Sequence, residues 1–260
     1  MSKGSVRVLC ALAAQAAILL ALTLPAHSGP SIDLPVANTP QGALSNAAAT
    51  EPAAIQPAPV DAEAAQEKPI SASEVLLELE RGMANIATLS ADFRQEKSLA
   101  AFRNKIVMNG KVFIRKPRIL AWHVTSPIRY SVVVTDKVIR QWDEDTRKVN
   151  EFAYTKNPMM KGVLDQMTAW FDGNYSGLMK SYTVSIAKRS PLVLEFRPAE
   201  GSMAAKAVEY VRVAFKPDRK HLDWLFIMER GGDRTLIEFS NTVVDAPLSD
   251  KVFEVDTGAL

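Results

Sequence analysis

Residues 106–124, IVMNGKVFIRKPRILAWHV, decide the fold class because their apolar side chains recur at every second position. Successive side chains of a β-strand point to opposite faces, so this period predicts strands with one face against a core. Pro117 ends the first of the two strands. One face of the pair carries Ile106, Met108, Gly110, Val112, Ile114, Leu120, Trp122 and Val124. The opposite face carries Val107, Asn109, Lys111, Phe113, Arg115, Ala121 and His123.

The same alternation continues on both sides of this pair and predicts roughly eleven strands. Short polar turns such as Asp136-Lys137 and Gly231-Gly232-Asp233 separate most of them. This spacing favours antiparallel hairpins over the strand and helix alternation of a nucleotide-binding sheet. The predicted strands span residues 91–96, 106–115, 120–124, 131–135, 138–143, 148–152, 182–188, 192–197, 208–215, 222–229 and 235–244.

Two helices are predicted beside the strands. The first begins at the candidate N-cap Ser73, and one face of it carries Leu76, Leu79, Met83 and Ile86. The second follows Asn157-Pro158, and its apolar face carries Met160, Val163, Leu164, Met167, Trp170 and Phe171. Methionine-rich faces adapt to apolar shapes of different form. This second helix is therefore either an ordinary cover for one end of the sheet or a movable lid over an apolar ligand.

Residues 1–28 have the pattern of a secretory signal peptide. After a short basic start, residues 8–24 are almost entirely apolar, and the small residues of Ala26-His27-Ser28 predict cleavage before Gly29. An uncleaved membrane anchor is the alternative, since the apolar run approaches the length that spans a bilayer. The single cysteine, Cys10, lies in this segment, so the mature chain would contain none.

The rest of the chain divides into a linker and one domain. Residues 29–70 are rich in proline and alanine and lack aromatic residues, which predicts a disordered linker. Residues 71–260 are long enough to bury a core without disulfides. The formal net charge of +2 is spread thinly along the chain, whereas nucleic-acid binding needs clustered lysine and arginine. We therefore predict no nucleic-acid partner.

The sequence contains few residue patterns that indicate catalysis. His123 and His221 are the only histidines beyond the signal, and no cysteine remains to complete a zinc site of the usual kind. We predict neither a metal nor a cofactor. An envelope hydrolase would require one of the two histidines to meet a carboxylate and a nucleophile in a cleft.

Several segments, taken in their order along the chain, match one family pattern. They are FRQ (93–95), GKVFIRKP (110–117), LAWHVTSP (120–127), VVVTD (132–136), DRTLIEFSN (233–241) and FEV (253–255). Over about residues 72–255 the chain resembles the LolA-like periplasmic outer-membrane lipoprotein carriers. The resemblance implies a mainly β (α+β) fold, in which helices form a lid over the hydrophobic concavity of an unclosed antiparallel β-barrel or strongly curved sheet.

The resemblance also implies a non-enzymatic function. A carrier or chaperone of this family shields lipoprotein acyl chains, or a related lipid, on the way from the inner to the outer membrane. Its implied partners are an inner-membrane release complex and an outer-membrane acceptor, and we expect a monomer in the periplasm. The implied lipid-binding residues are Ile106, Met108, Val112, Ile114, Leu120, Trp122 and Val124 on the strands, with Met160, Val163, Leu164, Met167 and Trp170 on the lid. Plain core packing is the alternative role for each strand residue.

One position departs from the family pattern. In these carriers an arginine precedes the proline and reaches from the inner face towards the lid backbone, and Lys116 holds that position here. Lysine is a point charge and not a rigid fork, which implies a weaker or differently built lid latch. This departure leaves open a paralogue that carries a non-lipoprotein lipid. A separate alternative is a lid-covered lipid sensor that its linker tethers at the envelope.

Overall fold

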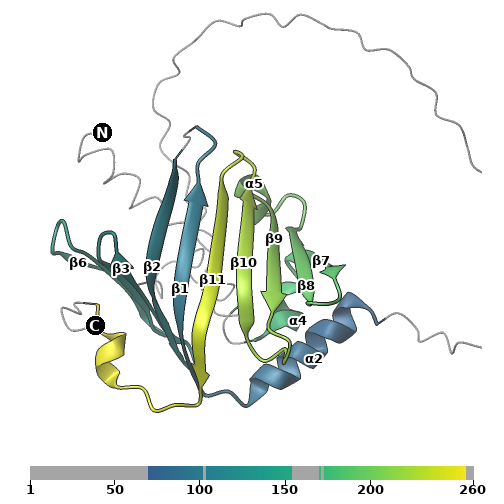
Figure 1. The fold of residues 1–260 in the computed structure, drawn as a ribbon, viewed down its shortest axis with the longest axis horizontal. Coiled ribbons are helices and arrows are strands. Elements are labelled where there is room, and N and C mark those ends of the chain that lie inside the picture. The colour runs from purple at the N-terminus through teal and green to yellow at the C-terminus, as the bar shows by residue number, and fades with distance from the viewer. Residues whose placement is uncertain (1–69, 102–103, 154–169, 171–172, 256–260) are drawn as a thin grey trace, which may run out of the picture. The chain divides into compact units, whose positions relative to one another are not determined.

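The computed structural model describes residues 70–101, 104–153, 170 and 173–255, which are arranged around one sheet (Figure 1). The predicted signal peptide and nearly all of the predicted linker lie outside the described residues. The helical elements are α2 (Ala72–Ala84), α4 (Tyr175–Leu178), α5 (Met203–Ala207) and the 3-10 helix η2 (Asp250–Phe253). The strands are β1 (Thr88–Ser98), β2 (Lys105–Arg115), β3 (Ile119–Ser126), β4 (Tyr130–Val134), β5 (Val138–Asp143), β6 (Val149–Ala153), β7 (Tyr182–Lys188), β8 (Val193–Pro198), β9 (Val208–Phe215), β10 (Leu222–Glu229) and β11 (Arg234–Val244).

The eleven strands form one antiparallel sheet, as the alternation predicted. Its order is β6-β5-β4-β3-β2-β1-β11-β10-β9-β8-β7, so the first and last strands pair in the middle. Every other pair joins strands that follow each other in the chain, which is the arrangement of successive hairpins. Within the described residues the edge strands β6 and β7 do not pair with each other, and the curved sheet stays unclosed (Figure 1). The predicted fold class is confirmed.

Helix α2 begins earlier than predicted. Its N-cap is Ser71 and not Ser73: the Ser71 hydroxyl accepts from the Glu74 backbone N–H at 3.2 Å, and the Glu74 carboxylate accepts from the Ser71 N–H at 2.7 Å. This reciprocal capping box requires an acid three residues after the cap, a spacing that Ser71 and Glu74 satisfy. No helix within the described part of the chain is long and apolar enough to cross a membrane.

The inner face of the sheet, on which Phe93 and Val112 lie, carries the main core. Residues of β3 and of the distant β8 belong to this one core, so the inner face is the concave one. Gly110 on β2 pairs with Phe93 on β1 and with Val124 on β3. A Cβ atom there would be 2.0 Å from the His123 carbonyl oxygen and 2.5 Å from the Phe93 ring, so only glycine fits. Helix α2 adds its buried residues Val75, Leu76, Leu79 and Met83 to this core.

The outer face carries a second, smaller core beneath the C-terminal segment. It consists of Phe113, Ala121, Val133, Trp142 and Val255, against which Leu248, Val252 and Phe253 pack. His123 faces outward, as predicted, but is only 1% exposed. The segment around η2 covers it, and β-alternation alone does not reveal such a cover.

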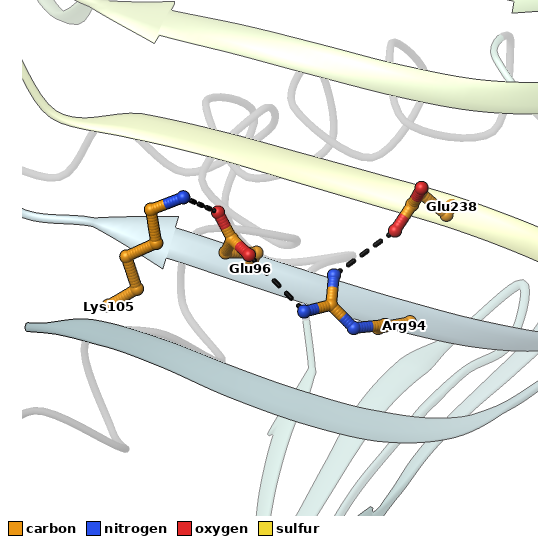
Figure 2. A network of polar contacts seen from close by, with 4 residues as sticks. All are labelled: Arg94, Glu96, Lys105 and Glu238. Carbon is orange, nitrogen blue, oxygen red and sulfur yellow. Dashed lines mark hydrogen bonds and ion pairs between the residues drawn. The ribbon is translucent and has the colours of Figure 1, made fainter.

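The outer face of β1 is charged instead. Arg94 donates to Glu96 at 3.2 Å and to Glu238 on β11 at 3.1 Å, and Lys105 on β2 pairs with Glu96 (Figure 2). The side chains of Arg94 and Glu238 are 45% and 53% exposed, so water screens their attraction. This part of the outer face is an ordinary solvated surface.

Candidate binding cavity

A cavity of about 30 Å³ lies on the inner face of the sheet, beside the C-terminal end of α2. A single water needs roughly 10–15 Å³ of such space, so the cavity has room for about two waters. A ligand as large as an acyl chain enters only if α2 or the lining side chains move. The apolar lining residues are Met83, Leu89, Ala91, Val112, Ile114, Leu222 and Phe239. The polar or amphipathic lining residues are Trp170, Tyr175, His221 and Thr242.

The predicted strand residues lie together on the inner face, at different distances from the cavity. Val112 and Ile114 line it directly. Ile106 is half-buried at the edge of the main core. Met108, Leu120, Trp122 and Val124 are buried in the same core. Trp122 stacks on Phe93 with ring centroids 3.9 Å apart, so it packs into the sheet wall.

Of the predicted lid residues, Trp170 is within the described residues and lines the cavity. It is 3% exposed and makes edge contacts with Phe196 on β8, at 4.6 Å, and with Tyr182 on β7, at 5.9 Å. Trp170 therefore packs against the β7–β8 arm of the sheet. The other predicted lid residues, Met160, Val163, Leu164 and Met167, lie outside the described residues.

Lys116 reaches the backbone of α2. Its Nζ donates to the Met83 carbonyl oxygen at 2.7 Å, in the last turn of the helix, where the same oxygen also accepts from the Ile86 backbone N–H at 3.2 Å. The preceding residue, Arg115, turns to the outer face as predicted. Its guanidinium group donates to Asp250 and to the Leu248 carbonyl oxygen, both at 2.7 Å. Arg115 and Lys116, which are adjacent in sequence, therefore make their contacts on opposite faces of the sheet.

Further contacts hold α2 to elements distant in sequence. Arg219, in the β9–β10 turn, donates to both carboxylate oxygens of Glu78 at 3.1 Å. Ser176 donates to Glu80 through its backbone N–H at 3.3 Å and its hydroxyl at 3.2 Å. Gly173 has a φ of +77°, and a Cβ atom there would lie 2.7 Å from the Met83 Cβ. Glycine lets the chain pass closely over the end of α2.

Polar atoms of four lining residues have no hydrogen-bond partner in the described structure. They are Trp170 Nε1, Tyr175 OH, His221 Nδ1 and Thr242 Oγ1. The Asp218 carboxylate is 3.7 Å from His221 Nδ1, beyond hydrogen-bond range. Burial, with the negative charge of Glu80, raises the pKa of Tyr175 far above its ordinary value, so its hydroxyl stays protonated. The cavity therefore combines an apolar wall with buried groups that can donate hydrogen bonds.

Several lining residues were missed by the sequence analysis. Leu89 and Ala91 share the inner face by the same two-residue period, so the pattern contained them. Thr242 and His221 carried no such signal, because a polar residue near the end of a strand ordinarily faces water. Lys97, which does not line the cavity, is the extreme case of a polar residue buried on the inner face. Its side chain is 4% exposed on the inner side of β1 and pairs with Glu229 at 3.0 Å.

His123 is not part of a catalytic triad in this arrangement. His123 Nδ1 lies 2.9 Å from Ser131 Oγ, and His123 Nε2 lies 2.8 Å from the Val252 carbonyl oxygen. Both ring nitrogens are thus engaged, and no position is left for the carboxylate of a catalytic triad. Among the described residues no cluster of histidine, cysteine and acidic side chains has the geometry to hold a metal ion.

The unclosed sheet with an apolar concave face under α2 places the chain in the class of open, strongly curved antiparallel β-sheet proteins. Comparison with known proteins identifies the family within this class. Residues 84–256 match the model of the outer membrane lipoprotein carrier protein LolA, and the chain belongs to the LolA family. This is a family of carrier proteins.

The similar proteins share little sequence with this chain. An outer-membrane lipoprotein carrier protein of Coxiella burnetii is 22% identical over 183 residues, which are 70% of this chain and 82% of the relative. The protein of that name in Francisella tularensis is 22% identical over 190 residues, covering 71% of this chain and 85% of the relative. A solved LolA superfamily protein from Nitrosomonas europaea has a TM-score of 0.39 and 10% identity, covering 72% of this chain and 99% of the other.

Proposed function

We propose that the protein is a periplasmic carrier that shields the acyl chains of lipoproteins, or of a related lipid, between the inner and outer membranes. One observation carries the proposal: the cavity lies on an apolar concave face that helix α2 covers from one side. Movement of α2 would extend the cavity along the inner face, over Ile114, Val112 and then Met108. Ile106, Leu120, Trp122 and Val124 would widen its wall.

The energetics suit a carrier that must also release its cargo. Burial of each CH₂ group contributes about 0.8 kcal/mol, so transfer of several acyl chains out of water is strongly favourable. Leu76, Leu79 and Met83 of α2 already cover part of the inner face. Loading therefore exchanges protein contacts for acyl contacts, and the net affinity is smaller than the transfer free energy. A small difference between the two states lets a membrane partner shift the equilibrium.

Lys116 is the proposed latch of the lid. Its charged hydrogen bond to Met83 is made through one nitrogen at the helix end, without the two-pronged geometry of arginine. Such a bond opens without disturbance of the sheet, since the Lys116 backbone N–H stays bonded to the Ala87 carbonyl oxygen at 2.9 Å. We assign the seal of the cavity to this contact and to the packing of Met83.

The remaining parts of the proposal concern delivery. Residues 1–28 would direct export and be cleaved, and residues 29–70 would form a mobile linker before the domain. An inner-membrane release complex would load the carrier and an outer-membrane acceptor would unload it. The carrier would act as a monomer without cofactor or metal.

A pair of adjacent residues provides the test. Ile106 is half-buried on the inner face, and Val107 is 37% exposed on the outer face of the same strand. A photo-crosslinking amino acid at Ile106 should capture acylated lipoproteins in cells, whereas the same amino acid at Val107 should not. Mass spectrometry of the wild-type protein from the periplasm identifies the cargo independently. Equal capture at both positions, with no lipid on the wild-type protein, would refute the proposal.

A further inference from the structure

The described polar side chains that line the cavity share one feature, which the shielding of hydrocarbon does not explain. Every lining residue with a side-chain nitrogen or oxygen among those described has one such atom buried without a partner. Tyr175 and Trp170 are 1% and 3% exposed as whole residues. A buried polar atom without a partner costs roughly 1–3 kcal/mol. Four such costs around one small cavity indicate a site for a ligand that supplies the missing bonds.

The chemistry of the four groups defines the ligand. Trp170 Nε1 only donates, and the hydroxyls of Tyr175 and Thr242 donate or accept. His221 Nδ1 donates or accepts according to the tautomer of the ring. The ligand must therefore bring acceptor oxygens. The described lining residues include neither lysine nor arginine, so a phosphate or carboxylate would be buried without a counter-charge. Neutral carbonyl oxygens meet both requirements.

The positions of the four polar groups suit one end of a binding site for an acyl chain. Tyr175 comes from α4, His221 from the turn before β10 and Thr242 from the end of β11. Val112 and Ile114 of β2, with Leu89 and Ala91 of β1, supply an apolar wall of the same cavity. A chain with a polar linkage at its head would place the linkage among the donors and its hydrocarbon along the inner face.

We infer that Trp170, Tyr175, His221 and Thr242 form a subsite for the carbonyl oxygens of ester- or amide-linked acyl chains. The inference rests on the proposed carrier function and deepens it by defining which acyl compounds are selected. The carrier then recognises the linkage between acyl chain and headgroup as well as the hydrocarbon. Simple hydrocarbons and ether lipids would bind less well than acyl esters of the same length.

The test compares two lipids that differ only in the linkage. The wild-type protein is titrated with 1,2-dioctanoylglycerol and with the matching diether, 1,2-dioctylglycerol. We expect the diester to bind about 3- to 10-fold more tightly, the effect of one or two hydrogen bonds. The double variant Tyr175→Phe with Thr242→Val should bring the ratio below about 2-fold, while its affinity for the diether stays within about 2-fold of wild type.

The controls separate the possible failures. Tyr130→Phe removes another buried hydroxyl without a described partner, but Tyr130 does not line the cavity, so the ester preference should persist. The melting temperature of the double variant should be equal to or above that of wild type, because no bond is lost; a fall would overturn the inference. Equal binding of both lipids by the wild type would overturn the subsite and leave the carrier intact. Binding of neither lipid by the folded protein would overturn the carrier itself.

Discussion

The two faces of β2, β3 and β4 carry two cores that are built differently. In the outer core, His123 is fully buried and both of its ring nitrogens have partners. In the inner core, His221 borders a cavity and its Nδ1 has no partner among the described residues. Residues on opposite faces are neighbours in sequence, as Val112 and Phe113 show. One strand thus serves a completed core and an incomplete one at the same time.

This difference separates stability from binding. The outer core is closed by the chain's own C-terminal segment, which supplies Val255 and the Val252 carbonyl oxygen. Displacement of this segment would break these contacts and, among the described residues, would free no polar group that lacks a partner. The inner core is closed by a helix with a few polar contacts, over polar atoms without partners. We therefore expect damage to the outer core to reduce folding stability and damage to the inner core to change binding.

Phe113→Ala should have the largest effect on stability. Truncation of a buried phenylalanine costs about 3–5 kcal/mol, and Phe113, 9% exposed, should lie near the lower end. Lipid affinity per folded molecule should stay at the wild-type value. The matched variant Val112→Ala removes a smaller side chain from the cavity wall and should alter lipid affinity. Urea unfolding and lipid titration measure the two quantities, and equal losses of affinity in both variants would contradict the separation.

His123 should make the outer core sensitive to acid. Burial, opposed in part by the hydrogen bond to Val252, lowers the pKa of His123 below its ordinary value of 6.5. Below pH 6.5 the unfolded chain then takes up a proton that the folded protein does not, so stability falls as the pH falls, by up to about 1.4 kcal/mol per pH unit.

The variant His123→Phe tests this linkage. It should lose about 1–3 kcal/mol at pH 7.5, because Ser131 and the Val252 carbonyl oxygen lose their partner, and the loss should shrink towards pH 5.5 as the wild type weakens. Urea unfolding at several pH values gives the two curves. Val112→Ala serves as the control, because Val112 lies in the inner core on the opposite face from His123 and the variant should retain the wild-type pH dependence. Parallel curves for His123→Phe and wild type would show that His123 titrates normally.

The contrast between the faces also explains how far sequence analysis reached. Alternation along 106–115 and 120–124 depends only on neighbouring residues, so the strands and their inner faces were predictable. The pairing of β1 with β11 joins residues such as Phe93 and Phe239, which are far apart in the chain, and no local pattern contains it. The cover over His123 and the convergence of Tyr175 with Thr242 depend on such long-range pairing and were missed.

The start of α2 shows a different kind of limit. Both Ser71 and Ser73 have the side chain of a helix N-cap, and the prediction chose the later one. The acid at Glu74 decides between them, because a capping box needs it three residues after the cap. The capping signal is contained in neighbouring residues, whereas the polar lining of the cavity forms only when the sheet is assembled.

Lys116→Met should loosen the inner core without disturbing the outer one. Loss of a charged hydrogen bond to Met83 should cost about 1–2 kcal/mol and speed both uptake and release of lipid, since α2 opens more often. Lys116→Arg retains a donor and should restore most of the wild-type rate. Lipid transfer from vesicles, followed by stopped-flow fluorescence, measures both rates. Unchanged rates of uptake and release in Lys116→Met would show that Lys116 is not the latch.

Arg219→Gln should have the smallest effect, which sharpens the role of Lys116. Arg219 also fastens α2, through both oxygens of Glu78, but the two side chains are 41% and 54% exposed. Exposed pairs contribute roughly 0–1 kcal/mol and weaken further in salt, so stability and transfer rates should barely change at physiological ionic strength. The same transfer assay at low and high salt checks this. A larger rate increase for Arg219→Gln than for Lys116→Met would mean that the contact at Glu78, in the middle of α2, controls entry, since the helix would then pivot about Met83 instead of opening there.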